Sequence, residues 1–431
     1  MRALFHAIIL LIVSAAQAYP QAVKPLSLED CIRLAQGAQS SVSVARQESE
    51  FARYGIDRAR AAFLPQVQVD NTYTYNSPQL RNPGESSFIA LNGIREYNAH
   101  LTAVQELDIS GRLRAELARA RADRDAATAS LNLSQRDLKR AVSAGFYRVL
   151  LARHLVLSTK DALAEAQAFA NRTQLLFEKG EAAQADVFKA SSEVAFMEQG
   201  LNSAQLDAEI ANHDLASFWT DTVGDALILE DPLAQPLPTL ESLPGNAGAS
   251  TIPSSYLKRP ELALLDAQQR GFLADSRQAR ANLLPQASFA FQYGMDSLHL
   301  SIRDRGYAAF VNLNIPVFDW FKTQNLARQF QLKARQVQVT HEIAIRTFSK
   351  EYQDALIRLK SLSQQVSLAE KQVKLSGENL RMSRVRYEGG EGAALEVVAA
   401  QNQLAQARTN YYTALAGFWN AKVDLEVATG Q

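Results

Sequence analysis

Phe177-Glu-Lys-Gly180, followed by Asp186-Val187, returns 210 residues later as Tyr387-Glu-Gly-Gly390, followed by Glu396-Val397. Self-similarity at a fixed spacing indicates an internally repeated architecture. Upstream, Phe63-Leu-Pro65-Gln returns as Leu283-Leu-Pro285-Gln at a spacing of 220, so the first copy carries ten extra residues between its two strands. The sequence therefore predicts two repeats, each with a helix, two strands, a very long helix, a tight turn and a return helix.

The N-terminus is typical of a Sec signal peptide over residues 1–18. A positively charged start and an apolar run precede Ala16-Gln-Ala18, a cleavage site that places the mature start near Tyr19. The only cysteine, Cys31, does not directly follow small residues, so we expect neither a lipid anchor nor an intrachain disulfide. No apolar stretch as long as a membrane helix follows the signal, so a mature chain that crosses a membrane must do so with strands.

Proline placement divides the mature chain. No proline lies between Pro83 and Pro232 or after Pro316, and a helix interior rarely tolerates one. The sequence predicts a first repeat over 19–223, a proline-rich connection over 224–260 and a second repeat over 261–431. The helices expected are long ones over 112–179 and 322–388 and return helices over 183–220 and 393–429.

Apolar residues recur at seven-residue spacing along the long helices. The second copy carries Ile345, Tyr352, Leu359, Val366, Val373, Leu380 and Tyr387, and the first carries Val142, Val149, Val156, Leu163, Ala170 and Phe177. Seven-residue periodicity over this length indicates supercoiled helices packed knobs into holes. We therefore expect antiparallel coiled-coil hairpins that fold back at Gly180 and at Gly389-Gly390.

Alternating apolar and polar residues predict two strands before each long helix, over 65–76, 97–108, 285–294 and 307–318. Each has about the length of a tilted transmembrane strand, with aromatic residues near the ends of its apolar band. An ordinary sheet with one face on a soluble core has the same pattern. Four strands cannot enclose a lumen, because membrane barrels begin at roughly eight strands, so a spanning barrel requires several copies of the chain.

Together these features resemble the TolC family of outer-membrane efflux channels. The likeness rests on the signal peptide, Leu26-Ser-Leu-Glu-Asp-Cys-Ile-Arg-Leu-Ala35, the Leu-Pro-Gln strand entries, Pro316-Val-Phe-Asp319 and the two aromatic-x-x-Gly turns. The resemblance implies a mainly α fold with a β-barrel part. In that fold a homotrimer forms a twelve-stranded barrel in outer-membrane lipid and a twelve-helix periplasmic tunnel. It also implies shorter helices over about 28–62 and 255–282 that stack end to end with the return helices.

The resemblance also implies a function: a passive conduit that receives substrate from an inner-membrane transporter through a periplasmic adaptor. Exit ducts of type I protein secretion share the fold and stay an alternative. The adaptor contact falls at the turns, and the residues implied are Phe177, Gly180, Asp186, Val187, Tyr387, Gly389, Gly390, Glu396 and Val397. Glycine permits the left-handed conformation that ends a helix, although a plain hairpin turn would use it equally.

One departure from the family concerns charge. Relatives carry acidic residues about one and two turns before the second turn's aromatic residue, where this chain has Arg381 and Arg384. If these residues line the periplasmic constriction, its charge is reversed or its gate is built differently. Basic residues near a helix C-terminus also complement the helix dipole, which is the alternative explanation.

Other classes of protein fit the sequence less well. The chain carries 45 basic and 45 acidic residues, and this balance argues against nucleic acid as a partner. Its histidines are dispersed, and Gly389-Gly-Glu-Gly392 lacks the lysine and hydroxyl of a phosphate loop, so we expect no enzyme activity, metal site or cofactor. A soluble periplasmic coiled-coil scaffold explains the helices but not the duplicated strands. The residues do not distinguish drugs, metals or proteins as cargo.

Overall fold

The chain divides into two compact units. A computed structural model describes residues 25–78, 80, 94–222, 224, 226–235, 237, 254–298 and 301–430. Unit 1 comprises Met1–Ser40, Asp137–Thr251 and Ala355–Glu426, and unit 2 comprises Ser41–Arg136, Ile252–Asp354 and Val427–Gln431. Each unit therefore combines parts of both sequence repeats. The signal peptide over 1–18 and part of the connection over 224–260 lie outside the described residues.

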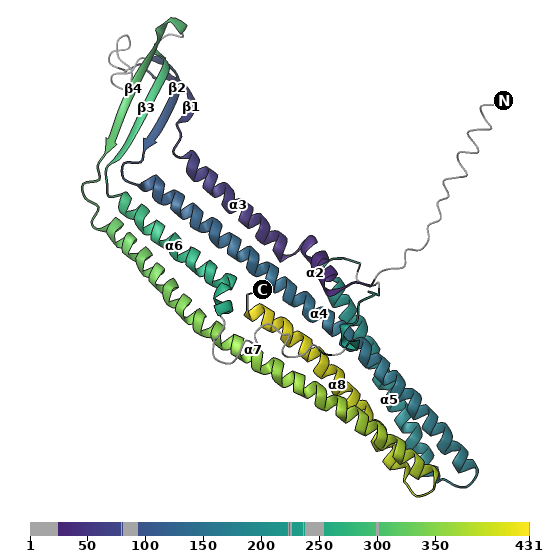
Figure 1. Cartoon of the computed structure of the whole chain (residues 1–431). Coiled ribbons are helices and arrows are strands. Elements are labelled where there is room, and N and C mark those ends of the chain that lie inside the picture. The colour runs from purple at the N-terminus through teal and green to yellow at the C-terminus, as the bar shows by residue number, and fades with distance from the viewer. Residues whose placement is uncertain are drawn as a thin grey trace, which may run out of the picture. The chain divides into compact units, whose positions relative to one another are not determined.

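Unit 1 is helical. Its elements are α2 (Leu28–Gly37), α5 (Gln184–Ala216), the short 3-10 helix η1 (Pro232–Ala234), most of α8 (Ala394–Ala428) and the later parts of α4 (Arg112–Glu178) and α7 (Lys322–Glu388). Within this unit, α4 with α5 and α7 with α8 form two hairpins that lie side by side (Figure 1). The residues that join them, called the hairpin core, are Phe169, Leu176, Ala190, Leu380, Tyr387, Ala394, Val397, Val398, Ala400 and Leu404.

The buried seam follows the predicted heptads in α7 but not throughout α4. Leu359, Val366 and Leu380 are buried, as are Val142 and Val149. Further along α4 the buried positions are one residue earlier than predicted, at Ala162, Phe169 and Leu176 rather than Leu163, Ala170 and Phe177. The later part of α4 therefore packs with a face that lies one residue before the predicted seven-residue stripe.

The expected helix over 28–62 is wrong in one respect, because the chain breaks it in two. Ser27 begins α2 with a capping box, in which its hydroxyl accepts the N–H of Asp30 at 3.1 Å. Ala38 then adopts an extended conformation with φ −77° and ψ 169°, so α2 ends at Gly37 and α3 (Ser41–Ala61) starts anew. Cys31 lies on the buried face of α2 and is fully inaccessible.

Unit 2 is built around one antiparallel sheet. Its strands are β1 (Gln66–Tyr75), β2 (Arg95–Leu107), β3 (Gln286–Ser297) and β4 (Arg305–Asn314), in the spatial order β1-β2-β3-β4. The helices α3 and α6 (Pro260–Ala281), two short 3-10 helices (Ser254–Lys258 and Ile302–Asp304) and the starts of α4 and α7 complete the unit. The β2–β3 pair joins the two repeats. The last strand ends at Asn314, four residues before the predicted end, since Pro316 cannot donate a ladder hydrogen bond.

The register gives the sheet one apolar and one polar face. Residues paired across strands share a face, and one such row is Val69, Leu101, Tyr293 and Tyr307. Nine large apolar residues of this face are 40–79% exposed: Val67, Val69, Tyr73, Leu101, Phe289, Phe291, Tyr293, Tyr307 and Val311. Rows on the opposite face are Gln68, Thr102, Gln292 and Ala308, and Glu106, Ser288 and Asn312. The apolar face is therefore not covered by a core within the described chain.

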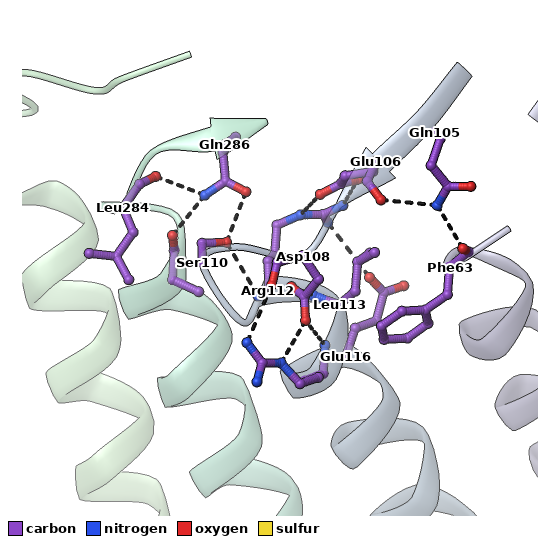
Figure 2. A network of polar contacts seen from close by, with 12 residues as sticks. Phe63, Gln105, Glu106, Asp108, Ser110, Arg112, Leu113, Glu116, Leu284 and Gln286 are labelled. Carbon is purple, nitrogen blue, oxygen red and sulfur yellow. Dashed lines mark hydrogen bonds and ion pairs between the residues drawn. The ribbon is translucent and has the colours of Figure 1, made fainter. Parts of the chain in front are cut away.

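A polar network fixes the junction between β2 and α4 (Figure 2). The guanidinium of Arg112 donates two hydrogen bonds to the Glu106 carboxylate, one of them at 2.9 Å, and this contact raises the pKa of Arg112. The Asp108 carboxylate accepts the N–H of Leu113 at 2.9 Å and so caps the helix. Gly111 just before the helix has a φ of +81°. The junction therefore holds the strand at a defined angle to the helix with saturated polar groups.

The corresponding junction between β4 and α7 has a different character. Trp320 and Phe321 have φ values of +56° and +62°, and Phe321 stands 210 residues after Gly111. The left-handed conformation costs a residue with a Cβ roughly 1–2 kcal/mol. Both side chains are exposed. Two bulky residues therefore occupy backbone positions that favour glycine, without burial to offset the strain.

Candidate functional site

In the first hairpin turn, between α4 and α5, Gly180 terminates helix α4. Its φ of +77° lies in the left-handed region that favours glycine. The N–H of Gly180 donates to the Phe177 carbonyl at 2.9 Å, and the N–H of Glu181 donates to the Leu176 carbonyl at 2.8 Å. This pair of bonds is a Schellman motif, which satisfies carbonyls at the end of α4 and reverses the chain.

The second turn, between α7 and α8, repeats the motif 210 residues later. Gly390 has a φ of +75°. The N–H groups of Gly390 and Glu391 donate to the carbonyls of Tyr387 and Arg386 at 3.1 and 2.9 Å. The Arg386 guanidinium also lies 3.1 Å from the Glu396 carboxylate and so bridges the turn. Leu176 holds the equivalent position in the first turn, and its apolar side chain cannot form such an ion pair.

The return helix of the first hairpin begins without a capping side chain. Ala183 is the N-cap of α5 and makes no side-chain hydrogen bond there. Alanine is among the weakest N-cap residues, so N–H groups at this helix start remain open to solvent or a partner. Asp186 and Glu396 lie in the first turns of α5 and α8, where the helix dipole favours a negative charge. The turns therefore combine exposed backbone donors with small side chains, which suits close approach by another chain.

The predicted docking residues separate by exposure. Phe177, Gly180, Gly389, Gly390 and Glu396 are exposed, and Asp186 and Val187 are half-buried. Tyr387 and Val397 are buried in the hairpin core. These two residues support the turn from below and present no surface to a partner.

The two predicted constriction residues make different contacts. Arg381 is exposed and pairs within its own helix with Glu378, at 2.9 Å. Arg384 is half-buried and lies 3.6 Å from Glu165 on α4, so it reaches across to the other hairpin. Arg408 on α8 approaches the same carboxylate at 3.5 Å. Glu165 is therefore shared by two arginines of the second hairpin.

Sequence reasoning missed Glu165 and Arg408. Glu165 interrupts an alanine-rich stretch, Ala162 to Ala170, that otherwise provides small residues for helix packing. A charge at such a position needs a partner of opposite charge, and this was the available signal. Its partners could not be named from the heptads alone, because they belong to the other repeat.

Two further features, a cluster of metal ligands and a membrane-spanning helix, are absent among the described residues. Within the described residues, no three His, Cys, Asp or Glu side chains lie together as metal ligands would. Among the described helices, none combines the length and the apolar character that crossing a bilayer requires.

Comparison with known proteins assigns the chain to a family. The family model for outer membrane efflux protein matches residues 31–220 and 252–431. The chain is 25% identical to the pyoverdine export outer membrane protein OpmQ of Pseudomonas putida, over 95% of this chain and 90% of the relative. It is 24% identical to the cation efflux system protein CusC of Escherichia coli, over 88% of this chain and 85% of the relative.

Solved structures agree on the fold. The outer membrane channel CmeC of Campylobacter jejuni matches with a TM-score of 0.84 at 17% identity, over 94% of this chain and 85% of that one. The outer membrane protein VceC of Vibrio cholerae matches with a TM-score of 0.81 at 15% identity, over 94% of this chain and 96% of that one. The predicted TolC-like fold is thus confirmed. With its two matched repeats, this chain belongs to the outer membrane efflux protein family and is a channel component of an efflux system.

Proposed function

We propose that three copies of this chain form an outer-membrane channel, with the sheet of each copy in the bilayer and the hairpins in the periplasm. The observation that carries the proposal is the sheet's exposed apolar face. A row such as Val69, Leu101, Tyr293 and Tyr307 has no covering core among the described residues. Lipid is the environment that such a face fits, with the polar face toward a lumen. A soluble coiled-coil scaffold would leave this face in water.

The open edges of the sheet support assembly of several copies. In the described part of the chain, β1 pairs along one side only, with β2, and β4 pairs along one side only, with β3. Unpaired edges in a bilayer would leave backbone groups without hydrogen bonds. Three copies join edge to edge and close a twelve-stranded barrel.

The surface of α7 supports the same assembly. Leu368, Leu375 and Met382 recur every seven residues and are 50–66% exposed. A seven-residue apolar stripe on a helix surface is a coiled-coil seam that awaits its partner. A neighbouring copy fills this seam, so that the hairpins close into a twelve-helix tunnel.

The channel works as a passive conduit in a tripartite system. The exposed turns at Gly180 and Gly390 dock a periplasmic adaptor, which delivers substrate from an inner-membrane transporter. Arg381 and Arg384 lie about two turns and one turn before Tyr387, and we place them at the periplasmic constriction. The repeats extend over 19–223 and 261–431, and residues 1–18 direct Sec export and are removed. Full burial of Cys31 supports a chain that carries no lipid on this residue.

The test uses the internal repeat. Tyr387 contacts Phe169 with a ring-centroid distance of 5.2 Å. The repeat makes Phe177 equivalent to Tyr387 and Asn379 equivalent to Phe169. If first and second hairpins alternate around the ring, Phe177 of one copy should contact Asn379 of its neighbour in the way that Tyr387 contacts Phe169 within one copy. In a Cys31→Ser background, F177C/N379C should give a disulfide-linked trimer in outer-membrane fractions, and F177C alone should not. A folded monomer in detergent, with no cross-linked species, would contradict the channel assembly.

A further inference from the structure

The two strand-to-helix junctions of unit 2 occupy equivalent places but expose different chemistry. At the first, Arg112 pairs with Glu106, and Asp108 accepts the N–H of Leu113 at the helix start (Figure 2). At the second, Lys322 replaces Arg112, and the residues before it are Phe318, Asp319, Trp320 and Phe321. The second junction therefore has exposed aromatic residues where the first has a network of polar contacts.

The aromatic residues form one exposed cluster. The ring centroids of Phe318 and Trp320 are 4.9 Å apart, and those of Phe318 and Phe321 are 6.0 Å apart. All three are more than 60% exposed, and Trp320 reaches 83%. Glycine at Phe321 would supply the left-handed backbone without strain, as Gly111 does in the first junction. Strain retained at an exposed aromatic residue points to a role for the side chain at a surface.

A cavity of about 490 Å³ opens beside the cluster and carries positive charge. Phe318, Phe321, Arg280 and Arg328 are among its lining residues. Neither arginine has an ion pair within the described residues. The one acidic lining residue, Asp319, already accepts the N–H of Thr323 at 2.9 Å. The cavity therefore offers two guanidinium groups to an anion, next to an apolar surface.

An exposed apolar stripe runs from β4 into the segment that follows it and leads to this cavity. Val311, Leu313, Ile315 and Val317 are all more than half exposed, and Val317 also lines the cavity. The cluster therefore continues the apolar face of the sheet at the end where the strand meets the helix. Aromatic side chains are favoured at the boundary between acyl chains and headgroups, and arginine binds phosphate there.

We propose that the cavity at the β4–α7 junction binds the headgroup of an anionic phospholipid in the periplasmic leaflet. Arg280 and Arg328 hold the phosphate, while Phe318, Trp320 and Phe321 lie in the region where acyl chains begin. This site rests on the proposed position of the sheet in the bilayer. The aromatic cluster next to the two arginines favours a lipid over free phosphate, because only a lipid has both a phosphate for the arginines and acyl chains for the aromatic residues.

Lipid retention on the purified channel tests the site. Native mass spectrometry should show that the wild type retains phosphatidylglycerol in preference to phosphatidylcholine. The double variant R280Q/R328Q should lose about tenfold in that preference, since two charge-assisted contacts disappear. The matched control is Arg305→Gln, which removes the same charge at the other end of β4 and should keep the preference. Phe321→Gly gives a second variant with a relaxed backbone, and it should also retain less lipid.

A second readout locates the aromatic cluster. In nanodiscs with brominated phosphatidylglycerol, Trp320 should be quenched, and Trp320→Phe should remove most of the quenching. Equal retention of both lipids by the wild type, or an unchanged preference in R280Q/R328Q, would overturn the site. Displacement of the lipid by inorganic phosphate alone would show a simple anion site and also overturn it. Trimer mass and conductance of the same preparations report the proposed function separately.

Discussion

Phe177 and Tyr387 hold equivalent positions in the two repeats, yet Tyr387 is 7% exposed against Phe169 and Phe177 is 38% exposed. Each hairpin has two sides, called flanks here, and within one chain only one flank of each hairpin packs against the other hairpin. Tyr387 lies on the packed flank of the second hairpin. Phe177 lies on the exposed flank of the first hairpin. The difference in exposure therefore distinguishes residues that stabilise the folded chain from residues that we expect to contact a neighbouring copy in the trimer.

The first prediction follows from this difference. Tyr387→Ala should lower the stability of the folded chain by about 3 kcal/mol, because it leaves a void in the hairpin core. Phe177→Ala should leave the folded chain unchanged but make the trimer dissociate more readily. Thermal unfolding by circular dichroism and native mass in detergent measure the two effects.

Tyr387→Phe is the matched control for this pair. The Tyr387 hydroxyl is buried without a hydrogen-bond partner among the described residues, so its removal should be neutral or stabilising by about 1 kcal/mol. Equal losses of chain stability in Tyr387→Ala and Phe177→Ala would contradict the assignment of flanks.

The sequence predicts the fold far better than the packing within it. The repeat of the turn motif and the heptads lead to the long helices, because periodicity is a local property of the chain. The one-residue shift of the seam to Phe169 and Leu176 is not local, since it depends on which face of α4 meets the second hairpin. The same limit hides the contact between Glu165 and Arg384. Exposure of Phe177 and burial of Tyr387 could not be distinguished either, because both occupy the same heptad position.

The second prediction concerns the turns. Gly180→Val and Gly390→Val each place a Cβ at a left-handed φ and should cost on the order of 1–2 kcal/mol at that turn. Trimers should persist at normal membrane level, because the hairpins bury far more surface than a turn. Export should fall, and cross-linking to the adaptor should weaken.

The matched control for the turns is Gly377→Ala. This glycine lies within α7 with open space around it, so alanine should be tolerated or should stabilise the helix by up to about 1 kcal/mol. Normal adaptor cross-linking in the Gly180→Val/Gly390→Val double variant would argue against docking at the turns.

The third prediction separates the two arginines before the second turn. If they line the constriction, the closed channel should disfavour small cations, because a narrow mouth with low-dielectric walls focuses their field. Arg381→Ala should reduce this effect most, since Arg381 is exposed and its ion pair with Glu378 lies within the same helix. Arg384→Ala should act more weakly, because Glu165 already offsets its charge.

Reversal potentials of purified trimers in planar bilayers measure the selectivity. Glu165→Gln serves as a control, because it keeps both arginines and removes their shared partner. It should strengthen the exclusion of cations while weakening the contact between hairpins. Identical selectivity in the wild type and in Arg381→Ala/Arg384→Ala would mean that both arginines lie outside the constriction.

The fourth prediction compares two glycines that face each other in the sheet. A Cβ on Gly294 would lie 1.9 Å from the Ala99 carbonyl oxygen, whereas nothing lies within 4 Å of a Cβ on Gly306. Gly294→Ala should therefore disrupt the β2–β3 pair and lower the yield of folded, heat-modifiable trimer. Gly306→Ala should assemble normally. Equal yields of the two variants on unheated gels would contradict the close approach at Gly294.

The fifth prediction concerns Cys31. Burial raises the pKa of its thiol from 9.0 to about 11, and the side chain is fully inaccessible. Since the thiolate is the reactive form, native Cys31 should react with maleimide at least about a hundredfold more slowly than the unfolded chain at pH 7.5.

The raised pKa of Cys31 also means that the folded state disfavours ionisation of the thiol. Its contribution to stability is therefore complete below pH 9 and is lost as the pH rises toward 11, by an amount on the order of 2 kcal/mol. Comparison of wild type with Cys31→Ala between pH 8 and pH 10.5 isolates this slope from other titrating groups. Rapid labelling of the folded channel would show that α2 opens and that Cys31 is not held in the core.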